Sequence, residues 1–180
     1  MTGYRVYRSN GAFVGLTLSQ MQDSRVFAFR GHGNQQVIRT GPPCCSSCNN
    51  RYALTMQMVQ ALPNNALGDL RLFVASACAT GEGGINGNNL INAVHGRGAH
   101  ITIGFQENIY TVSGCAWMEA FIPALRGRTV HSAMDVADDV LESYRRSWLL
   151  WQRPRGDIRT QNRLIRSRYA NNSTNVRISP

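Results

Sequence analysis

The chain has 180 residues, of which 43% are apolar and 16% charged, and its formal net charge is +9. This composition excludes a disordered chain, and the length fits a single folded domain. The sequence contains no run of about 18 apolar residues, and its first residues lack an apolar signal core, so we expect a cytoplasmic protein without a membrane span.

The positive charge is concentrated at the C-terminal end. Residues 144–180 contain many arginines and a single acid, Asp157, and hold nearly all of the excess charge. A basic surface can bind nucleic acid by releasing counterions from phosphates. Because the charge is confined to one segment, we favour a solvated face or a partner-docking arm over a nucleic-acid-binding surface.

The N-terminal region is expected to form a hairpin at one edge of the domain. Residues 4–8 and 12–18 are two short alternating stretches. Asn10 and Gly11 separate them, and an Asn-Gly pair is a typical hairpin turn. We therefore predict two short strands before residue 20.

A buried strand is expected over residues 25–29. This short apolar run ends in Gly31-His32-Gly33. An apolar run that stops at a glycine-bounded turn is typical of a core strand. His32 is therefore expected at the C-terminal end of the strand. A polar loop follows, and then a helical pattern from Tyr52 to Leu62.

A second apolar run, residues 70–77, leads directly into Cys78 and a glycine-rich turn. Strand, helix and strand in this order form a crossover unit whose strands run parallel, so their C-terminal ends lie at one edge of the sheet. His32 and Cys78 are therefore expected to meet at that edge.

Further along the chain, strands and helices continue to alternate. We expect a strand at residues 99–105 and helices at residues 88–95, 114–125 and 130–143. This pattern predicts an α/β fold with a mostly parallel sheet flanked by helices in three layers. Residues 1–143 are the expected domain, with the N-terminal hairpin, and residues 144–180 the basic C-terminal extension.

Two sequence blocks resemble a known superfamily. VFAFRGHG is an apolar strand ending in His-Gly, and LRLFVASACATG is an apolar strand ending in Ala-Cys. The pair resembles caspase-like (clan CD) cysteine peptidases. The later blocks GRGAHITIGFQENIY and FIPALRGRTVHSAMDVADDVL are similar to the CHAT branch. The resemblance covers roughly residues 25–142 and implies a caspase-like fold and a His-Cys dyad.

The resemblance implies roles for particular residues. Cys78 is the expected nucleophile, and His32 the expected base and acid. The backbone N–H groups of Gly33 and Cys78 are expected to stabilise the oxyanion. A strand-terminal cysteine is often only a small buried residue, and a histidine beside glycines can be a turn residue. The two blocks in the right order favour catalysis over these readings.

The other cysteines give no clear metal site. Five cysteines, an odd number, predict reduced thiols rather than a disulfide framework. Cys44, Cys45 and Cys48 include a Cys-x-x-Cys spacing, but no second such pair exists, so we predict loop thiols, no metal and no cofactor.

Substrate preference is read from the loop after the third strand. By resemblance this loop, with Glu107 and Asn108, binds the side chain before the scissile bond, and Glu107 would then select a basic one. The alternative is that Glu107 is only solvated, as an acid at an exposed strand end usually is. Related arginine-specific peptidases often have an aspartate two residues before the nucleophile, where this chain has Ser76. This difference argues against arginine specificity.

The sequence therefore predicts a cysteine endopeptidase that cleaves a protein substrate and is regulated by a partner or signal. Its partners are a protein or peptide substrate and an activating or inhibitory protein, with no membrane. Two alternatives stay open at this point, a catalytically silent caspase-like scaffold and a basic nucleic-acid-binding module. Because only about 24 residues precede the His32 strand, an edge strand could also pair with a partner.

Overall fold

The computed structural model describes residues 14–41, 52–148, 168–171 and 174–178. Four strands form the main sheet in the order β1-β5-β6-β7. Their bounds are β1 (Val26–Arg30), β5 (Leu72–Ser76), β6 (Ile101–Phe105) and β7 (Arg168–Asn171). The first three strands are parallel, and β7 runs antiparallel to β6. Residues in β5 and β6 are all buried, as expected for central strands covered on both faces.

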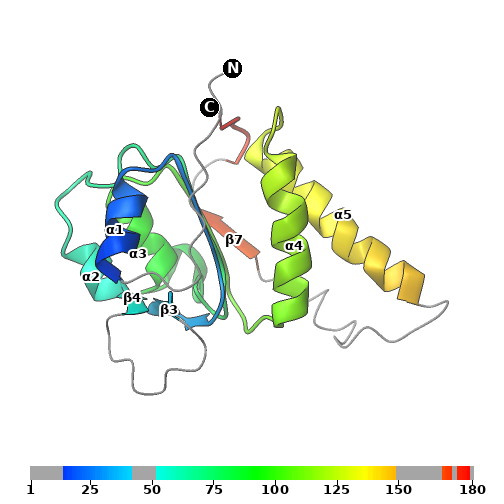
Figure 1. Cartoon of the computed structure of the whole chain (residues 1–180), viewed down its shortest axis with the longest axis horizontal. Helices are drawn as coiled ribbons and strands as arrows, with labels where there is room; N and C mark the ends of the chain where they lie inside the picture. Colours follow the sequence, from blue (N-terminus) through cyan, green and yellow to red (C-terminus); the bar gives the residue numbers. More distant parts are fainter. Residues whose placement is uncertain (1–13, 42–51, 149–167, 172–173, 179–180) are drawn as a thin grey trace.

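Helices cover both faces of this sheet, which confirms the predicted three-layer α/β fold (Figure 1). On one face lie α1 (Val14–Gln22), α2 (Met56–Gln60), α3 (Leu90–Gly96) and the short 3-10 helix η2 (Gly84–Asn86). On the other lie α4 (Thr111–Ala124) and α5 (Val130–Trp148). None of the described helices combines the length and apolar character needed to cross a bilayer.

The core is divided between the two faces of the sheet. On the face covered by α4 and α5, the alternate β6 residues Ile101, Ile103 and Phe105 pack against these two helices. The Trp117 ring stacks on Phe121 and meets Phe105 edge to face, with centroid distances of 4.6 and 5.5 Å. These apolar contacts hold α4 at a fixed position over the sheet.

A small second sheet follows β1 directly. It contains β2 (Gly33–Asn34), β3 (Val37–Arg39) and β4 (Ala53–Thr55). The predicted helix at residues 52–62 is therefore a short strand followed by α2. Thr55 ends the strand and begins the helix, because its side-chain oxygen accepts a hydrogen bond from the Met58 N–H at 3.2 Å.

The prediction of an N-terminal hairpin was wrong in its second strand, which is the helix α1. Thr17 and Met21 are four residues apart and both are buried, so they share one helix face. Burial of this helix face stabilises a helix here, although the alternating sequence pattern predicted a strand. The first predicted strand lies outside the described residues.

The described parts of residues 144–180 belong to the same folded unit. Helix α5 continues to Trp148, and β7 pairs with β6 at the edge of the main sheet (Figure 1). The Val176 and Thr174 carbonyls accept hydrogen bonds from Val130 N and His131 N at 2.9 and 2.8 Å. These bonds satisfy N–H groups in the first turn of α5 that have no partner within the helix. Near the chain end, Ile178 packs into the core under α4 and α5.

Ending the chain after residue 167 should therefore destabilise the whole domain. The loss of Ile178 burial and of the two bonds to α5 should cost at least about 3 kcal/mol. We expect the Tm to fall by about 6–12 °C in a thermal melt followed by circular dichroism. A chain lacking only Ser179 and Pro180 is the control. An unchanged Tm in the shorter chain would show that residues 168–178 do not stabilise the fold.

Candidate functional site

The pairing of β1 with β5 brings two predicted site residues to one edge of the sheet. The strands are parallel, and the last aligned pair is Arg30 and Ser76. His32 and Cys78 each follow two residues later. Gly31 N donates a hydrogen bond to Ser76 O at 3.2 Å, which extends the pairing beyond the strands. Both residues therefore leave the sheet at the same level.

His32 and Cys78 line one small cleft of about 40 Å3. Its wall is formed by the ends of β1 and β5 and by the start of α4. The lining residues are Arg30, Gly31, His32, Ser76, Cys78, Ile109, Tyr110, Thr111 and Gly114. His32 is exposed and Cys78 is half-buried. A substrate can therefore reach both side chains from solvent.

The Cys78 thiol is held by the backbone of the loop after β6. Ile109 N donates a hydrogen bond to Cys78 Sγ at 3.4 Å, and the thiol lies 3.5 Å from the Ile109 carbonyl. The loop thus fixes the position of the sulfur.

The chain turns sharply after Cys78. Ala79 has φ of 52°, a left-handed conformation that is costly for a residue with a Cβ. Its N–H donates to Glu107 O at 3.0 Å. The buried Thr80 hydroxyl lies 3.3 Å from Ala75 O and 3.2 Å from Ala77 O. These contacts hold the strained turn, which sets the direction of the Cys78 side chain.

Gly33 lies beside the cleft rather than in its lining, and its role in binding the oxyanion stays a prediction. Arg39 N donates to His32 O at 2.9 Å, so the neighbouring pair Gly33 and Ile38 is of the non-hydrogen-bonded type. The Gly33 N–H therefore points away from β3. A Cβ at Gly33 would lie 2.8 Å from Val37 O and 2.9 Å from Ala77 Cβ. Only glycine allows the His32 turn to approach the end of β5 this closely.

The structure places the remaining predicted site residues beside the cleft rather than in its lining. Glu107 and Asn108 are exposed, and the Glu107 carbonyl supports the Ala79 turn. A role for the Glu107 carboxylate in substrate binding stays a prediction. Arg30, Gly114 and residues 109–111 line the cleft although sequence reasoning did not select them as site residues. Only the tertiary approach of α4 to β5 brings Gly114 there.

Among the described residues, no group of three or more His, Cys, Asp or Glu side chains could hold a metal ion. Cys44, Cys45 and Cys48, which were considered as zinc ligands, lie outside the described residues. Of the described cysteines, Cys78 and Cys115 are both free thiols. Only Cys78 belongs to the cleft lining.

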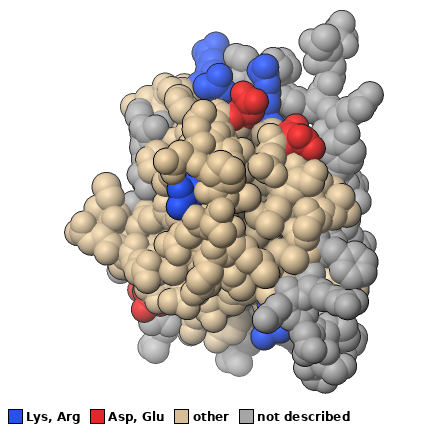
Figure 2. Space-filling model, turned by 90° about the vertical axis from the view of Figure 1, so that its left-hand side faces the viewer, with Lys and Arg blue, Asp and Glu red and all other residues tan. Residues whose placement is uncertain are grey.

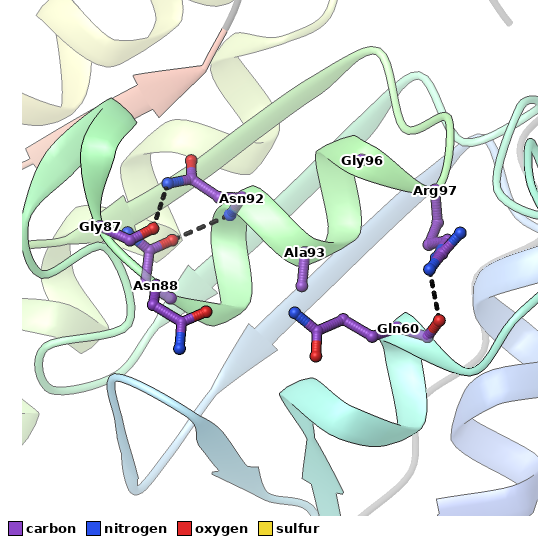
Figure 3. A pocket seen from close by; sticks show the side chains of 8 residues that line it. Gln60, Gly87, Asn88, Asn92, Ala93, Gly96 and Arg97 are labelled. Atoms are coloured by element: carbon purple, nitrogen blue, oxygen red, sulfur yellow. Dashed lines mark hydrogen bonds between the residues drawn. The ribbon is translucent and has the colours of Figure 1, made fainter.

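A larger cleft of about 290 Å3 lies between α2 and α3 (Figure 3). Amide side chains dominate its polar lining, and Asn92 is held by a hydrogen bond from its amide to Gly87 O at 2.7 Å. Arg97 donates to Gln60 O at the other end. The lining contains no nucleophile and no acid-base pair. The adjoining face also carries few charged side chains among its described residues (Figure 2). The smaller cleft is therefore the candidate site.

No protein-family model and no curated protein matches the sequence. The structure is similar to that of the Arg-specific cysteine proteinase gingipain R, with a TM-score of 0.69 and 10% identity over 94% of this chain. The fold is caspase-like. A complex of the Porphyromonas gingivalis RgpB pro- and mature domains gives a TM-score of 0.65 at 11% identity over 93% of this chain. A third structure, described as a protease, gives 0.60 at 14% over 88%.

This chain spans 37%, 37% and 36% of the lengths of those three chains. At identities of 10–14% the likeness shows the fold alone. The function of the cleft at the ends of β1 and β5 therefore has to be inferred from the residues that line it.

Replacing Gly33 with alanine should distort the candidate site. The new methyl group has backbone oxygen and Ala77 Cβ within 3.0 Å, so the turn must move, at a cost of about 1–3 kcal/mol in the free energy of unfolding. Gly96→Ala is the matched control, because a Cβ there meets nothing within 4 Å. Urea unfolding followed by fluorescence measures both. Equal stability of the two variants would contradict the close approach of the His32 turn to β5.

Proposed function

We propose that this chain is a cysteine peptidase in which Cys78 is the nucleophile and His32 the acid-base group. One observation carries the proposal, namely that an imidazole and a thiol from two parallel strands line the same solvent-accessible cleft. The likeness in fold to cysteine proteinases supports the same reading. The resemblance of the sequence blocks to the CHAT branch stays our prediction for the subgroup.

The first half of the proposed reaction forms an acyl-enzyme. The Cys78 thiolate attacks the carbonyl carbon of the scissile peptide, and the carbonyl electron pair moves onto oxygen. The Gly33 N–H points away from β3, and together with the Cys78 N–H it donates to this oxyanion. When the tetrahedral intermediate collapses, the C–N bond breaks and protonated His32 gives its proton to the leaving amine.

The second half releases the product and restores the enzyme. His32, now neutral, accepts a proton from a water molecule as that water attacks the thioester carbon. The C–S bond then breaks, and Cys78 leaves as a thiolate beside the protonated imidazole. No cofactor enters these steps. The exposed position of His32 lets water reach the thioester once the amine product has left.

Partner control is part of the proposal. Among the described strands, β1 pairs with β5 alone, and its other edge is where an added strand would bind. Because only Gly31 separates β1 from His32, a strand bound at this edge would also order the dyad. An activating or inhibitory protein that adds a strand here is therefore the proposed regulator.

Removing either member of the dyad should abolish peptidase activity without unfolding the domain. Cys78→Ala should leave no measurable cleavage of an unfolded protein substrate, and His32→Ala should lower kcat by a factor of about 100–10,000. Cys115→Ala is the matched control, since Cys115 is also a free, half-buried thiol but lies outside the cleft. Gel-based cleavage assays and circular dichroism measure both properties. Equal activity of the Cys78 and Cys115 variants would exclude the mechanism and favour a silent scaffold.

A further inference from the structure

The larger of the two clefts, about 290 Å3, lies between α2 and α3, and the proposed peptidase reaction makes no use of it (Figure 3). Its volume is close to the lower end of the range of roughly 300–1,000 Å3 in which proteins bind small ligands. The two clefts share no lining residue. The ligand that the larger cleft could hold is therefore inferred from its own walls.

Two asparagine side chains make one wall of this cleft rigid. Asn89 is 1% exposed, and its amide donates to Glu82 O at 2.8 Å and to Gly84 O at 3.0 Å. The Asn92 amide donates to Gly84 O at 2.8 Å and to Gly87 O at 2.7 Å. These bonds hold the glycine-rich turn before α3 in one position. Because the wall is preformed, a ligand does not have to order it on binding.

Two further amide side chains face the open space of the cleft. Gln60 is the last residue of α2, and Asn88 lies in the loop before α3. Both are exposed, and neither side-chain amide has a hydrogen-bond partner within the described part of the chain. In Figure 3 the two amides point toward one another across the cleft. Each has one acceptor oxygen and two N–H donors, so the space between them suits a ligand that both donates and accepts hydrogen bonds.

The one charged side chain among the described residues of the lining, Arg97, is already engaged. Its guanidinium donates to Asn64 Oδ1 at 2.6 Å and to Gln60 O. These bonds tie the end of α3 to the end of α2 and close one end of the cleft. The surrounding face carries few charged side chains among its described residues (Figure 2). The cleft therefore favours an uncharged polar ligand over an anion.

The floor of the cleft suits a peptide main chain. Gly87, Ala93 and Gly96 are small, and a Cβ at Gly96 would meet nothing within 4 Å, so a ligand backbone can approach α3 closely. The described lining contains no aromatic side chain on which a sugar ring or a base could stack. A peptide group has one N–H donor and one C=O acceptor, which complement the free amides of Gln60 and Asn88.

We propose that this cleft binds a short, uncharged peptide segment of another protein through the main chain of that segment. The Gln60 and Asn88 amides each pair with a peptide group of the ligand, and α3 forms the surface on which the ligand lies. The site gives the domain a second point of contact with a protein ligand, apart from Cys78. It does not depend on the proposed peptidase function.

Nuclear magnetic resonance spectroscopy of the full chain tests the proposal with the blocked, uncharged peptide acetyl-Ala-Ser-Ala-amide. We expect the side-chain NH2 signals of Gln60 and Asn88 to shift and to saturate with a Kd of about 1 mM. An analogue methylated on every main-chain nitrogen keeps the side chains and loses the N–H donors, so it should bind about tenfold more weakly. Equal binding of the two peptides would overturn recognition of the main chain.

Variants of the cleft show whether its own residues hold the peptide. Gln60→Ala should weaken binding about fivefold, since it removes one hydrogen bond. Gln57→Ala is the matched control, because Gln57 is also an exposed glutamine of α2 but lies outside the lining. Gly96→Leu should abolish binding by filling open space, while the Tm of the domain stays unchanged. An unaltered Kd in Gly96→Leu would place the peptide elsewhere and contradict the proposal.

Three further results distinguish the proposal from its competitors. Shifts of the Gln60 and Asn88 signals caused only by maltotriose would make the cleft a saccharide site, and shifts caused only by inorganic phosphate would make it an anion site. No shift at about 10 mM peptide would exclude a peptide site. Cys78→Ala should bind the peptide with the same Kd, so failure of the peptidase mechanism would leave this result intact.

Discussion

The parallel pairing of β1 with β5 is the constraint on which the candidate site depends. The ladder aligns Arg30 with Ser76, so the residues that follow each strand emerge side by side. Backbone hydrogen bonds set this register, and apolar burial on both faces keeps it, since a slip of one residue would turn every buried side chain of β5 to the opposite face. The positions of His32 and Cys78 are therefore set by the sheet rather than by contacts of their own.

Loops from three directions then complete the site around this edge. Strand β2 brings the Gly33 backbone against Ala77, and the N–H of the left-handed Ala79 donates to Glu107 O at 3.0 Å. The loop after β6 supplies Ile109, whose backbone contacts the thiol. Further from the cleft, Asn89 is 1% exposed and its amide donates to Glu82 O at 2.8 Å, which ties the glycine-rich turn to α3. A flexible, glycine-rich sequence is thus fixed by interactions with its neighbours.

Much of this arrangement could be predicted from the sequence, because buried strands are apolar and end at glycines. The predicted strands at β1, β5 and β6 are confirmed, as is their parallel order. The strand β7 could not be predicted, since Arg168–Asn171 contains no apolar run and becomes a strand only through its pairing with β6. Arg30 and Gly114 were missed for a similar reason, because their place in the cleft depends on how closely α4 approaches β5.

The most direct test of the account is a crystal structure of the protein after reaction with a peptidyl aldehyde. The aldehyde carbonyl should be bonded to Cys78 Sγ, with its oxygen within hydrogen-bond distance of the Gly33 and Cys78 N–H groups and the His32 ring beside it. An aldehyde bound at Cys115, or an oxygen directed away from Gly33, would contradict the proposed site.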